Sequence, residues 1–121
     1  MSVGSNQSVD VGANQATTVA KNQDVTIGGA ASIEIAKTSA VKVGDARTTS
    51  VTKDDSLTVG KNLIIEAGDS VLIRTGSASL SLKKDGTIVI KGKDILLDGS
   101  GKITVKADGD IKMTGSKILQ N

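Results

Sequence analysis

The sequence of 121 residues contains no cysteine, no histidine, no proline and no aromatic residue. Without cysteine the chain cannot form disulfides, thiolate metal sites or a thiol nucleophile. Without histidine it lacks the base that most often activates a serine hydroxyl. Aromatic side chains bury about 150–250 Å² each in an ordinary core, so any interior here is built from Val, Ile, Leu and Ala. The composition predicts a narrow, repetitive interior.

An excess of charge of one sign is also missing. The chain has 15 basic and 13 acidic residues and a net charge of +2, which is too balanced for a nucleic-acid-binding surface. The N-terminal MSVGSNQSVD lacks the basic and apolar regions of a signal peptide. No apolar run approaches the roughly 18 residues of a membrane-spanning helix. We therefore expect a soluble chain that is not exported by a cleavable signal and has no nucleic-acid partner.

An eight-residue repeat dominates the first half of the chain. A Val or Ile recurs at every eighth position, and these axial residues are Val3, Val11, Val19, Ile27, Ile35, Val43, Val51 and Val59. The next residue is usually Gly and otherwise small, and an apolar residue often stands two positions before the axial one. Apolar residues two apart predict a strand with one dry face, and a glycine permits a turn with φ > 0. Each octad is therefore predicted to be one short strand and one bend.

The repeat becomes looser in the second half. Apolar pairs persist, but the spacing between them varies from seven to nine residues; the pairs are Leu63/Ile65, Val71/Ile73, Leu80/Leu82, Ile88/Ile90, Ile95/Leu97, Ile103/Val105 and Ile111/Met113. We expect the bends to absorb these changes, because a slip within a strand would turn its side chains to the wrong face. The predicted corners are Gly68, Gly76, Gly86, Gly92, Gly99, Gly109 and Gly115. We predict one domain over residues 1–121, with regular octads in 1–60, looser repeats in 61–115 and a tip in 116–121.

Two all-β architectures satisfy such a repeat. Three octads of one chain could form each coil of a single-chain β-solenoid. Alternatively, three chains could wind together into an intertwined homotrimeric β-helix, or β-prism, each adding one strand in turn to each face. The solenoid would have about five coils with unpaired edge strands at both ends and nothing evident to cap them. This difference favours the trimer, with the axial residues layered along its axis.

The repeats resemble those of a known family. The stretch VGSNQSVDVGANQATTVAKNQDVTIGG looks like the octads of spike proteins in contractile injection machines, and phage tail spikes share it. Residues 61–121, which begin KNLIIEAGDSVLIRTG, resemble the C-terminal β-helix of VgrG (valine-glycine repeat) spike proteins of type VI secretion. The resemblance implies a homotrimeric needle on an inner-tube stack, with a PAAR-repeat protein on its blunt end. We expect this chain to be the needle portion, without the family's large N-terminal base or a C-terminal effector domain.

No motif supports enzymatic or cofactor chemistry. The GSGK at 99–102 has Leu96 and Ile103 where a phosphate-binding loop needs Gly and Ser or Thr. The aspartates at 54–55 and 108–110 lack the phased spacing of a calcium repeat. We therefore expect no catalytic, cofactor or metal site. The final residues break the repeat, and the resemblance favours docking of the tip protein there, through Lys117, Ile118, Leu119, Gln120 and Asn121.

The resulting functional prediction is mechanical. A rigid trimeric needle would transmit thrust to a target membrane and cross it when pushed, carrying a tip protein and effectors. Such a chain would be cytoplasmic before firing and then secreted or delivered through the machine. The alternatives are the needle of a phage tail spike and a single-chain solenoid that binds a repetitive ligand.

Overall fold

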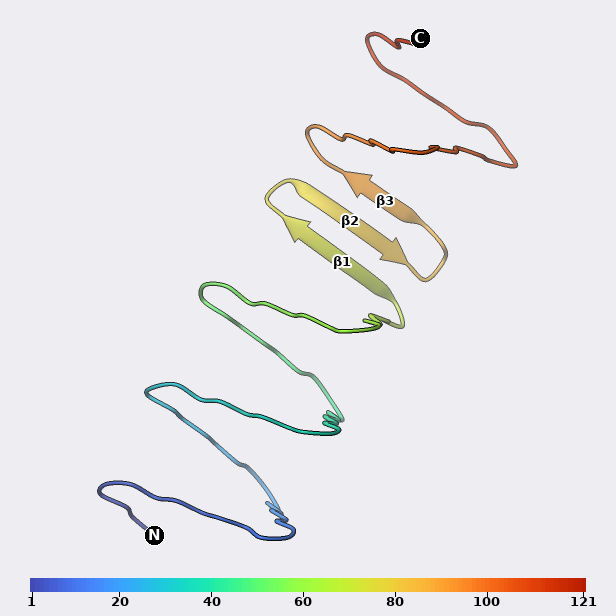
Figure 1. Ribbon diagram of the computed structural model, residues 1–121. Helices are drawn as coiled ribbons and strands as arrows, with labels where there is room; N and C mark the ends of the chain where they lie inside the picture. Colours follow the sequence, from blue (N-terminus) through green and yellow to red (C-terminus); the bar gives the residue numbers. More distant parts are fainter. The chain divides into compact units, whose positions relative to one another are not determined.

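A computed structural model describes all residues 1–121, and its only regular elements are β-strands (Figure 1). The strands are β1 (Ser70–Thr75), β2 (Ala78–Lys83) and β3 (Ile88–Lys91). The chain divides into two compact units, Met1–Thr52 and Lys53–Asn121. The first unit consists of extended segments and bends, and the second contains the three strands. No helix of the length and hydrophobicity needed to cross a bilayer is present.

The bends of the octads recur with the predicted period. The first eight bends begin at the small residue that follows an axial Val or Ile, and the ninth begins at Gly68, after Ala67, with the same spacing of eight residues. The bends lie at residues 4–5, 12–13, 20–21, 28–29, 36–37, 44–45, 52–53, 60–61 and 68–69. The predicted alternation of extended segments and corners is therefore confirmed. Among the later corners, bends include Gly68, Gly76, Gly86 and Gly109, but begin one residue after Gly92, Gly99 and Gly115.

The expected use of φ > 0 at the octad corners is wrong. Only Gly76 and Gly86 have a positive φ. The octad bends are made with ordinary backbone angles, which agrees with the presence of Ala20, Ala36 and Thr52 where other octads have glycine. A small side chain suffices at these corners, and the left-handed conformation is not needed.

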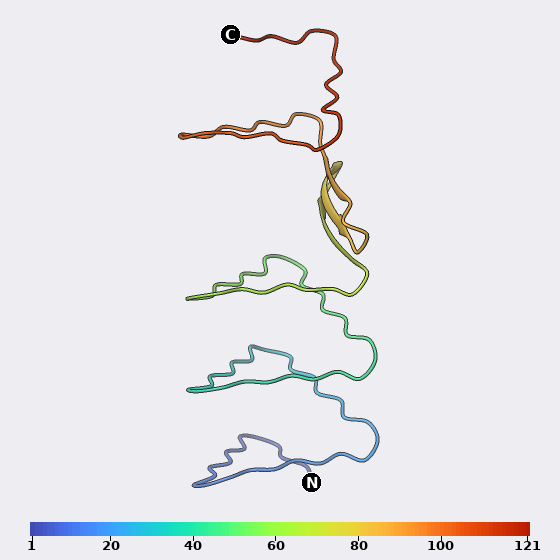
Figure 2. The same ribbon diagram turned by 90° about the vertical axis from the view of Figure 1, so that its right-hand side faces the viewer.

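The three strands form an antiparallel sheet in the order β1-β2-β3. The strands lie side by side in Figure 1, and Figure 2 shows the sheet nearly edge-on. β1 and β2 pair from Ser70↔Lys83 to Thr75↔Ala78, which leaves Gly76 and Ser77 as a two-residue loop. Gly76 has φ +53° at the first loop position. This is the glycine position of a type II′ hairpin turn, whose twist matches that of the strands.

A longer turn joins β2 to β3. Lys83 N–H donates to the Thr87 carbonyl at 3.0 Å, and Gly86 N–H donates to the Lys83 carbonyl at 3.0 Å. Gly86 has φ +91°, so the loop has the pattern of a three-residue hairpin that ends on a bulge glycine. The Asp85 carboxylate accepts a hydrogen bond from Thr87 N–H at 2.9 Å. That bond is the main reason why the pKa of Asp85 is lowered from its ordinary value of 3.8.

The all-β fold class is confirmed, and the pairs Val71/Ile73, Leu80/Leu82 and Ile88/Ile90 all lie in strands. The pairing of these strands within one chain was not predicted, because the repeat had been interpreted as continuous winding. Two local signals point to it. Asp85-Gly86 between two alternating segments is a strong hairpin signal, and Gly76-Ser77 is a further two-residue hairpin loop.

Candidate interaction surfaces

The chain has no side chain that is buried within it, either apolar or polar. Its accessible surface is 13501 Å². A compact folded chain of this mass exposes about 6,100 Å², and the fully unfolded chain exposes about 17,700 Å². One copy therefore removes only a small part of its surface from water, and cannot derive ordinary domain stability from its own contacts. The functional surfaces of this protein are to be sought among its exposed apolar side chains.

The axial residues of the octads keep a consistent and partial exposure. The side chains of Val3, Val11, Val19, Ile27, Ile35, Val43, Val51 and Val59 are 41% to 53% exposed. The apolar residues two positions earlier are 68% to 87% exposed, and they are Val9, Val25, Ile33, Val41 and Leu57. The axial side chains are therefore less exposed than the side chains two positions earlier. Both sets lack a packing partner within the chain, and the layering of the axial residues on a shared axis stays a prediction.

The octad backbone also lacks partners within the chain. All backbone–backbone hydrogen bonds involve residues between Asp69 and Lys91. An extended segment carries one N–H donor and one carbonyl acceptor per residue, and these groups must be paired or hydrated. The octads thus present both an apolar side chain and a free strand edge at regular intervals.

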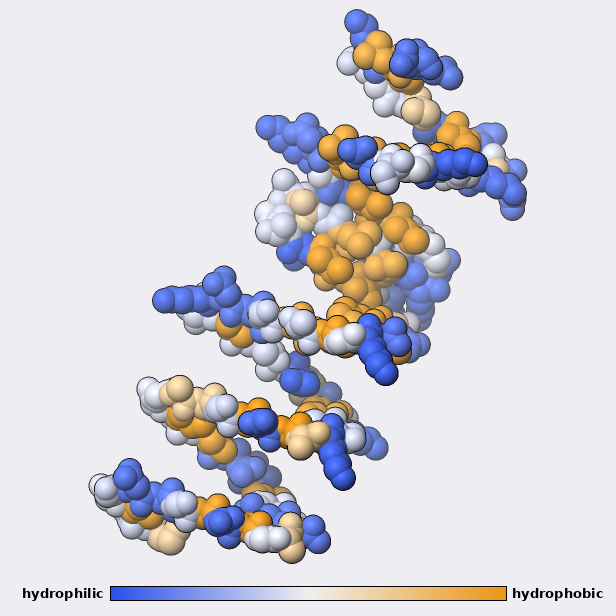
Figure 3. Space-filling model, in the orientation of Figure 1, coloured by the Kyte–Doolittle hydropathy of each residue, from blue (hydrophilic) through white to orange (hydrophobic).

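One face of the β1–β3 sheet is aliphatic over two rows of side chains, and a third row on that face holds Thr75 and Ala78. The register of the sheet aligns the two aliphatic rows across the three strands; one row is Val71, Leu82 and Ile88, and the other is Ile73, Leu80 and Ile90. We call these residues the aliphatic face. Hydrophobic residues gather over the sheet in Figure 3. Sequence reasoning identified each pair separately and missed the face, because only the register shows which pairs align.

The opposite face of the sheet is mostly polar. Its rows contain Ser70 with Lys83, Leu72 with Ser81 and Val89, and Arg74 with Ser79 and Lys91. Each strand places one cationic side chain on this face, opposite the aliphatic face, as the two-residue period of a strand allows. The sheet has one surface suited to water and one suited to packing.

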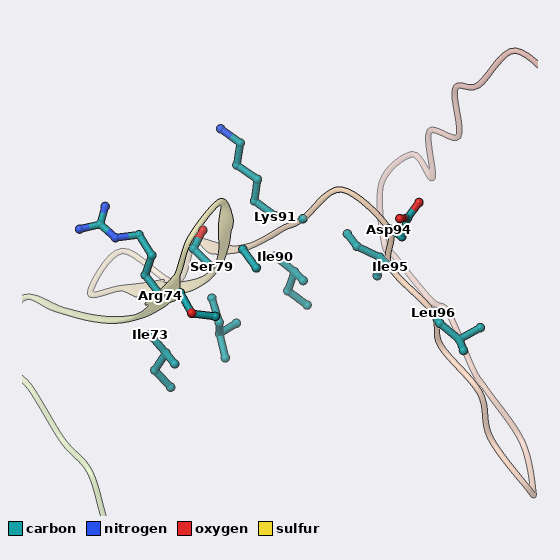
Figure 4. A pocket seen from close by; sticks show the side chains of 12 residues that line it. Ile73, Arg74, Ser79, Ile90, Lys91, Asp94, Ile95 and Leu96 are labelled. Carbon is teal, nitrogen blue, oxygen red and sulfur yellow. The ribbon is translucent and has the colours of Figure 1, made fainter. Parts of the chain in front are cut away.

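A hollow of about 480 Å³ lies where the ends of β1, β2 and β3 meet the segment Gly92–Leu96. Figure 4 shows Ile73 and Ile90 pointing to one side of the sheet and Arg74 and Lys91 to the other. No hydrogen bond or salt bridge joins the polar side chains of its lining. The hollow therefore offers an apolar recess at the edge of the aliphatic face, without an acid–base or nucleophile–base pair.

The predicted tip residues lie in the last segment, after the bend at Ser116. Ile118 and Leu119 are exposed, and no hydrogen bond within the chain involves residues 117–121. Their role in docking stays a prediction. No cluster of three or more acidic side chains that could hold a metal ion is present anywhere in the chain.

Comparison with known proteins points to an assembly role. The family model described as the bacteriophage T4 gp5 C-terminal trimerisation domain matches residues 1–75. The chain is also similar to the type VI secretion system spike protein VgrG1b of Pseudomonas aeruginosa, with 54% identity over 57 residues. That similarity covers 47% of this chain and 8% of the relative's length. The resemblance of the repeats to those of VgrG-type spikes is confirmed by these matches.

Proposed function

Because the chain belongs to the family of the bacteriophage T4 gp5 C-terminal trimerisation domain, we propose that three copies wind together into a rigid β-helical needle. The needle would serve as part of the spike of a type VI secretion machine. The similarity to a spike protein of that system supports the choice of machine. In this proposal residues 1–60 are the regular shaft, 61–115 a looser continuation and 116–121 the tip.

The observation that carries the trimer is the absence of any buried side chain in one copy. In a single-chain solenoid, successive octads would stack on one another and pair their backbones within the chain. Here the octads make no backbone–backbone hydrogen bond. Two further chains would supply both missing elements, since each can pair an edge and cover an axial residue. Burying one Val or Ile side chain stabilises by about 1.5–3 kcal/mol, and the octads repeat this gain along their length.

The mechanism follows from that assembly. Interlocked strands would share hydrogen bonds along the whole length, so bending or shearing the needle would break many bonds together. Outward positions such as Asp10, Glu34 and Lys42 are charged and would lose hydration in lipid. The needle would therefore cross a target membrane when the machine drives it, without inserting by itself, and would leave the producing cell by that route. This role needs no enzymatic activity.

The two ends of the needle would contact other parts of the machine. We place a PAAR-repeat tip protein on the C-terminal end, contacting Lys117, Ile118, Leu119, Gln120 and Asn121. Unpaired backbone groups there could extend a partner's sheet, and Ile118 and Leu119 would add apolar contacts. At the other end, a base domain would connect the needle to the inner tube. Effectors would travel with the tip.

Sedimentation of the purified chain tests the trimer. The expected mass is about 37 kDa, three times the 12.2 kDa of one chain. A monomer that shows cooperative thermal unfolding at the same concentration would contradict the proposal and favour a self-contained solenoid.

Removal of residues 117–121 tests the tip. We expect the truncated chain to stay trimeric and to lose binding of a PAAR-repeat protein measured by titration calorimetry. A chain with Ser2 and Ser5 replaced by Ala is a control at the opposite end and should bind as before. Undiminished binding after the truncation would remove the docking assignment and leave the trimer untouched.

A phage tail needle is the second candidate, favoured by the description of the matching family as a bacteriophage domain. It shares the trimer and the mechanical role. The two candidates differ in the protein that carries the needle. Co-purification of the protein from its native host with a type VI inner-tube protein or with a phage tail protein would distinguish them.

A further inference from the structure

The octads alone leave the alignment of three chains ambiguous. Each of the eight axial positions from Val3 to Val59 holds Val or Ile, and the bends recur with the same spacing. A chain displaced along its neighbours by one octad would again place Val or Ile against Val or Ile. Register is weakly specified wherever displaced pairings are nearly equivalent. A trimer built from such repeats needs an element that is not repeated.

The β1–β3 sheet is such an element. It is the only region in which the chain pairs with itself, over residues 70–91. Its central strand pairs with β1 and β3, and the outer edges of β1 and β3 stay free. One copy therefore leaves those edges unpaired and the aliphatic face uncovered. The members of that face remain exposed or half-buried in one copy. Displacement by one octad would set one strand of this face against an extended segment and misalign the remaining strands.

Two observations favour the same face of further copies as the partner of the aliphatic face. The trimerisation-domain match extends through Thr75 and so includes the whole of β1. The face therefore begins inside the stretch that matches a trimerising family and continues directly from the octads. The opposite face carries Arg74, Lys83 and Lys91, and three copies of these cations would be costly to bury without partners. Only the aliphatic face is suited to the axis.

We propose that the aliphatic faces of three β1–β3 sheets pack against one another on the trimer axis and fix the register of the three chains. This inference rests on the proposed trimer and adds a specific role to residues 70–91. Pairing between chains would give way here to pairing within each chain, so three small sheets would form the sides of a prism. The octads would determine the length of the needle, and the sheet would determine which octads of the three chains lie at the same level.

Two neighbouring residues of β1 provide a matched test. Ile73 belongs to the aliphatic face and Leu72 to the opposite face, yet their side chains are 58% and 54% exposed in one copy. Replacement by Asp should therefore affect one isolated chain similarly at either position. We expect Ile73→Asp to lower the sedimentation mass from about 37 kDa towards the 12.2 kDa of one chain. Leu72→Asp should leave the trimer mass unchanged.

A milder variant measures register directly. The chain has no cysteine, so Ser5→Cys allows a single nitroxide label per chain in the first bend. Aligned chains related by a threefold axis should give a single narrow distribution of distances between labels in pulsed electron paramagnetic resonance. We expect the label in the Ile73→Ala background to give additional distances while the mass stays trimeric. The labelled Leu72→Ala chain should keep one distance.

The outcomes separate this inference from the proposed trimer. A monomeric wild-type chain would overturn both. A trimeric wild-type chain with Ile73→Asp also trimeric, or with equal loss in Leu72→Asp and Ile73→Asp, would overturn the role of the aliphatic face alone. A single narrow distance in Ile73→Ala would show that register is set elsewhere.

Discussion

The octads and the β1–β3 sheet have the same alternation of aliphatic residues, but only the sheet pairs its backbone hydrogen-bonding groups within the chain. The octads place an apolar residue two positions before the axial one, as in Val9 and Val11, and pair with nothing in the chain. The sheet places Val71 and Ile73 at the same spacing and pairs within the chain. Side-chain alternation therefore gives both regions an apolar face, but it does not determine which strand pairs with which.

The difference lies in the connections. Gly76 and Gly86 take positive φ and reverse the chain within two or three residues. The octad bends keep negative φ and turn the chain without folding it back on itself. A hairpin delivers the next strand to the edge of the previous one, whereas an open bend leaves that edge for another chain. The sign of one backbone angle thus separates the region that pairs within the chain from the region whose edges stay unpaired.

The largest loss of stability is expected from a charged side chain at an axial position of the octads. Val51→Asp would place three carboxylates in one layer of the trimer, and burial of unpaired charge is among the most destabilising changes known. We expect a loss of more than about 4 kcal/mol in the free energy of trimer unfolding, measured by denaturant titration. Ser50→Asp adds the same charge at the adjacent outward position and should change stability by less than about 0.5 kcal/mol. Equal effects would mean that Val51 does not face the axis.

Two glycine substitutions compare the hairpin turn of the sheet with a bend of the octads. Gly76→Ala forces a Cβ into a loop position with φ +53° and should destabilise the trimer by at least about 1 kcal/mol per chain. Gly60→Ala changes an octad corner where an added Cβ meets nothing within 4 Å in the chain. Because other octads hold Ala or Thr there, we expect a change below about 0.5 kcal/mol. Thermal unfolding at fixed chain concentration measures both, and a larger loss from Gly60→Ala would contradict the distinction.

The sequence was sufficient for the features that each octad decides locally. The all-β class and the nine bends from Gly4 to Gly68 follow from side-chain period and small residues alone. The sign of φ in those bends could not be predicted, because glycine adopts both positive and negative φ and its presence favours neither. The alanines at 20 and 36 were the available evidence for negative φ.

The aliphatic face could not be derived from composition or spacing. A nine-residue step from Ile73 to Leu82 is compatible with a wider corner and with a hairpin. Only the register shows that Ile73 aligns with Leu80 and Ile90. The sequence also does not identify the partners of the octads. An exposed strand edge shows that backbone groups need hydrogen bonds, but it does not show which chain supplies them.

Acid should affect the sheet through Asp85. Hydrogen bonding from Thr87 N–H holds the pKa of Asp85 below its ordinary value of 3.8. A carboxylate with a lowered folded-state pKa stabilises the fold above the unfolded value, and that contribution is lost as pH falls through the folded-state pKa. Asp85→Asn keeps an acceptor oxygen and removes the titration. We expect the melting temperature of the wild-type chain to fall more steeply than that of Asp85→Asn below about pH 4, and parallel curves would contradict this role.

The smallest expected effect concerns the join between the last octad bend and the sheet. Lys84 Nζ lies 3.3 Å from Asp69 Oδ1, but the two side chains are 74% and 88% exposed, and such a pair contributes less than about 0.5 kcal/mol. Lys84 N–H also donates to the Asp69 carbonyl at 3.0 Å, and that bond survives a side-chain change. We therefore expect Lys84→Ala to shift the denaturation midpoint only slightly, with no added loss in high salt. A large salt-dependent loss would show that the side chains, and not the backbone, connect the bend at Asp69 to the turn after β2.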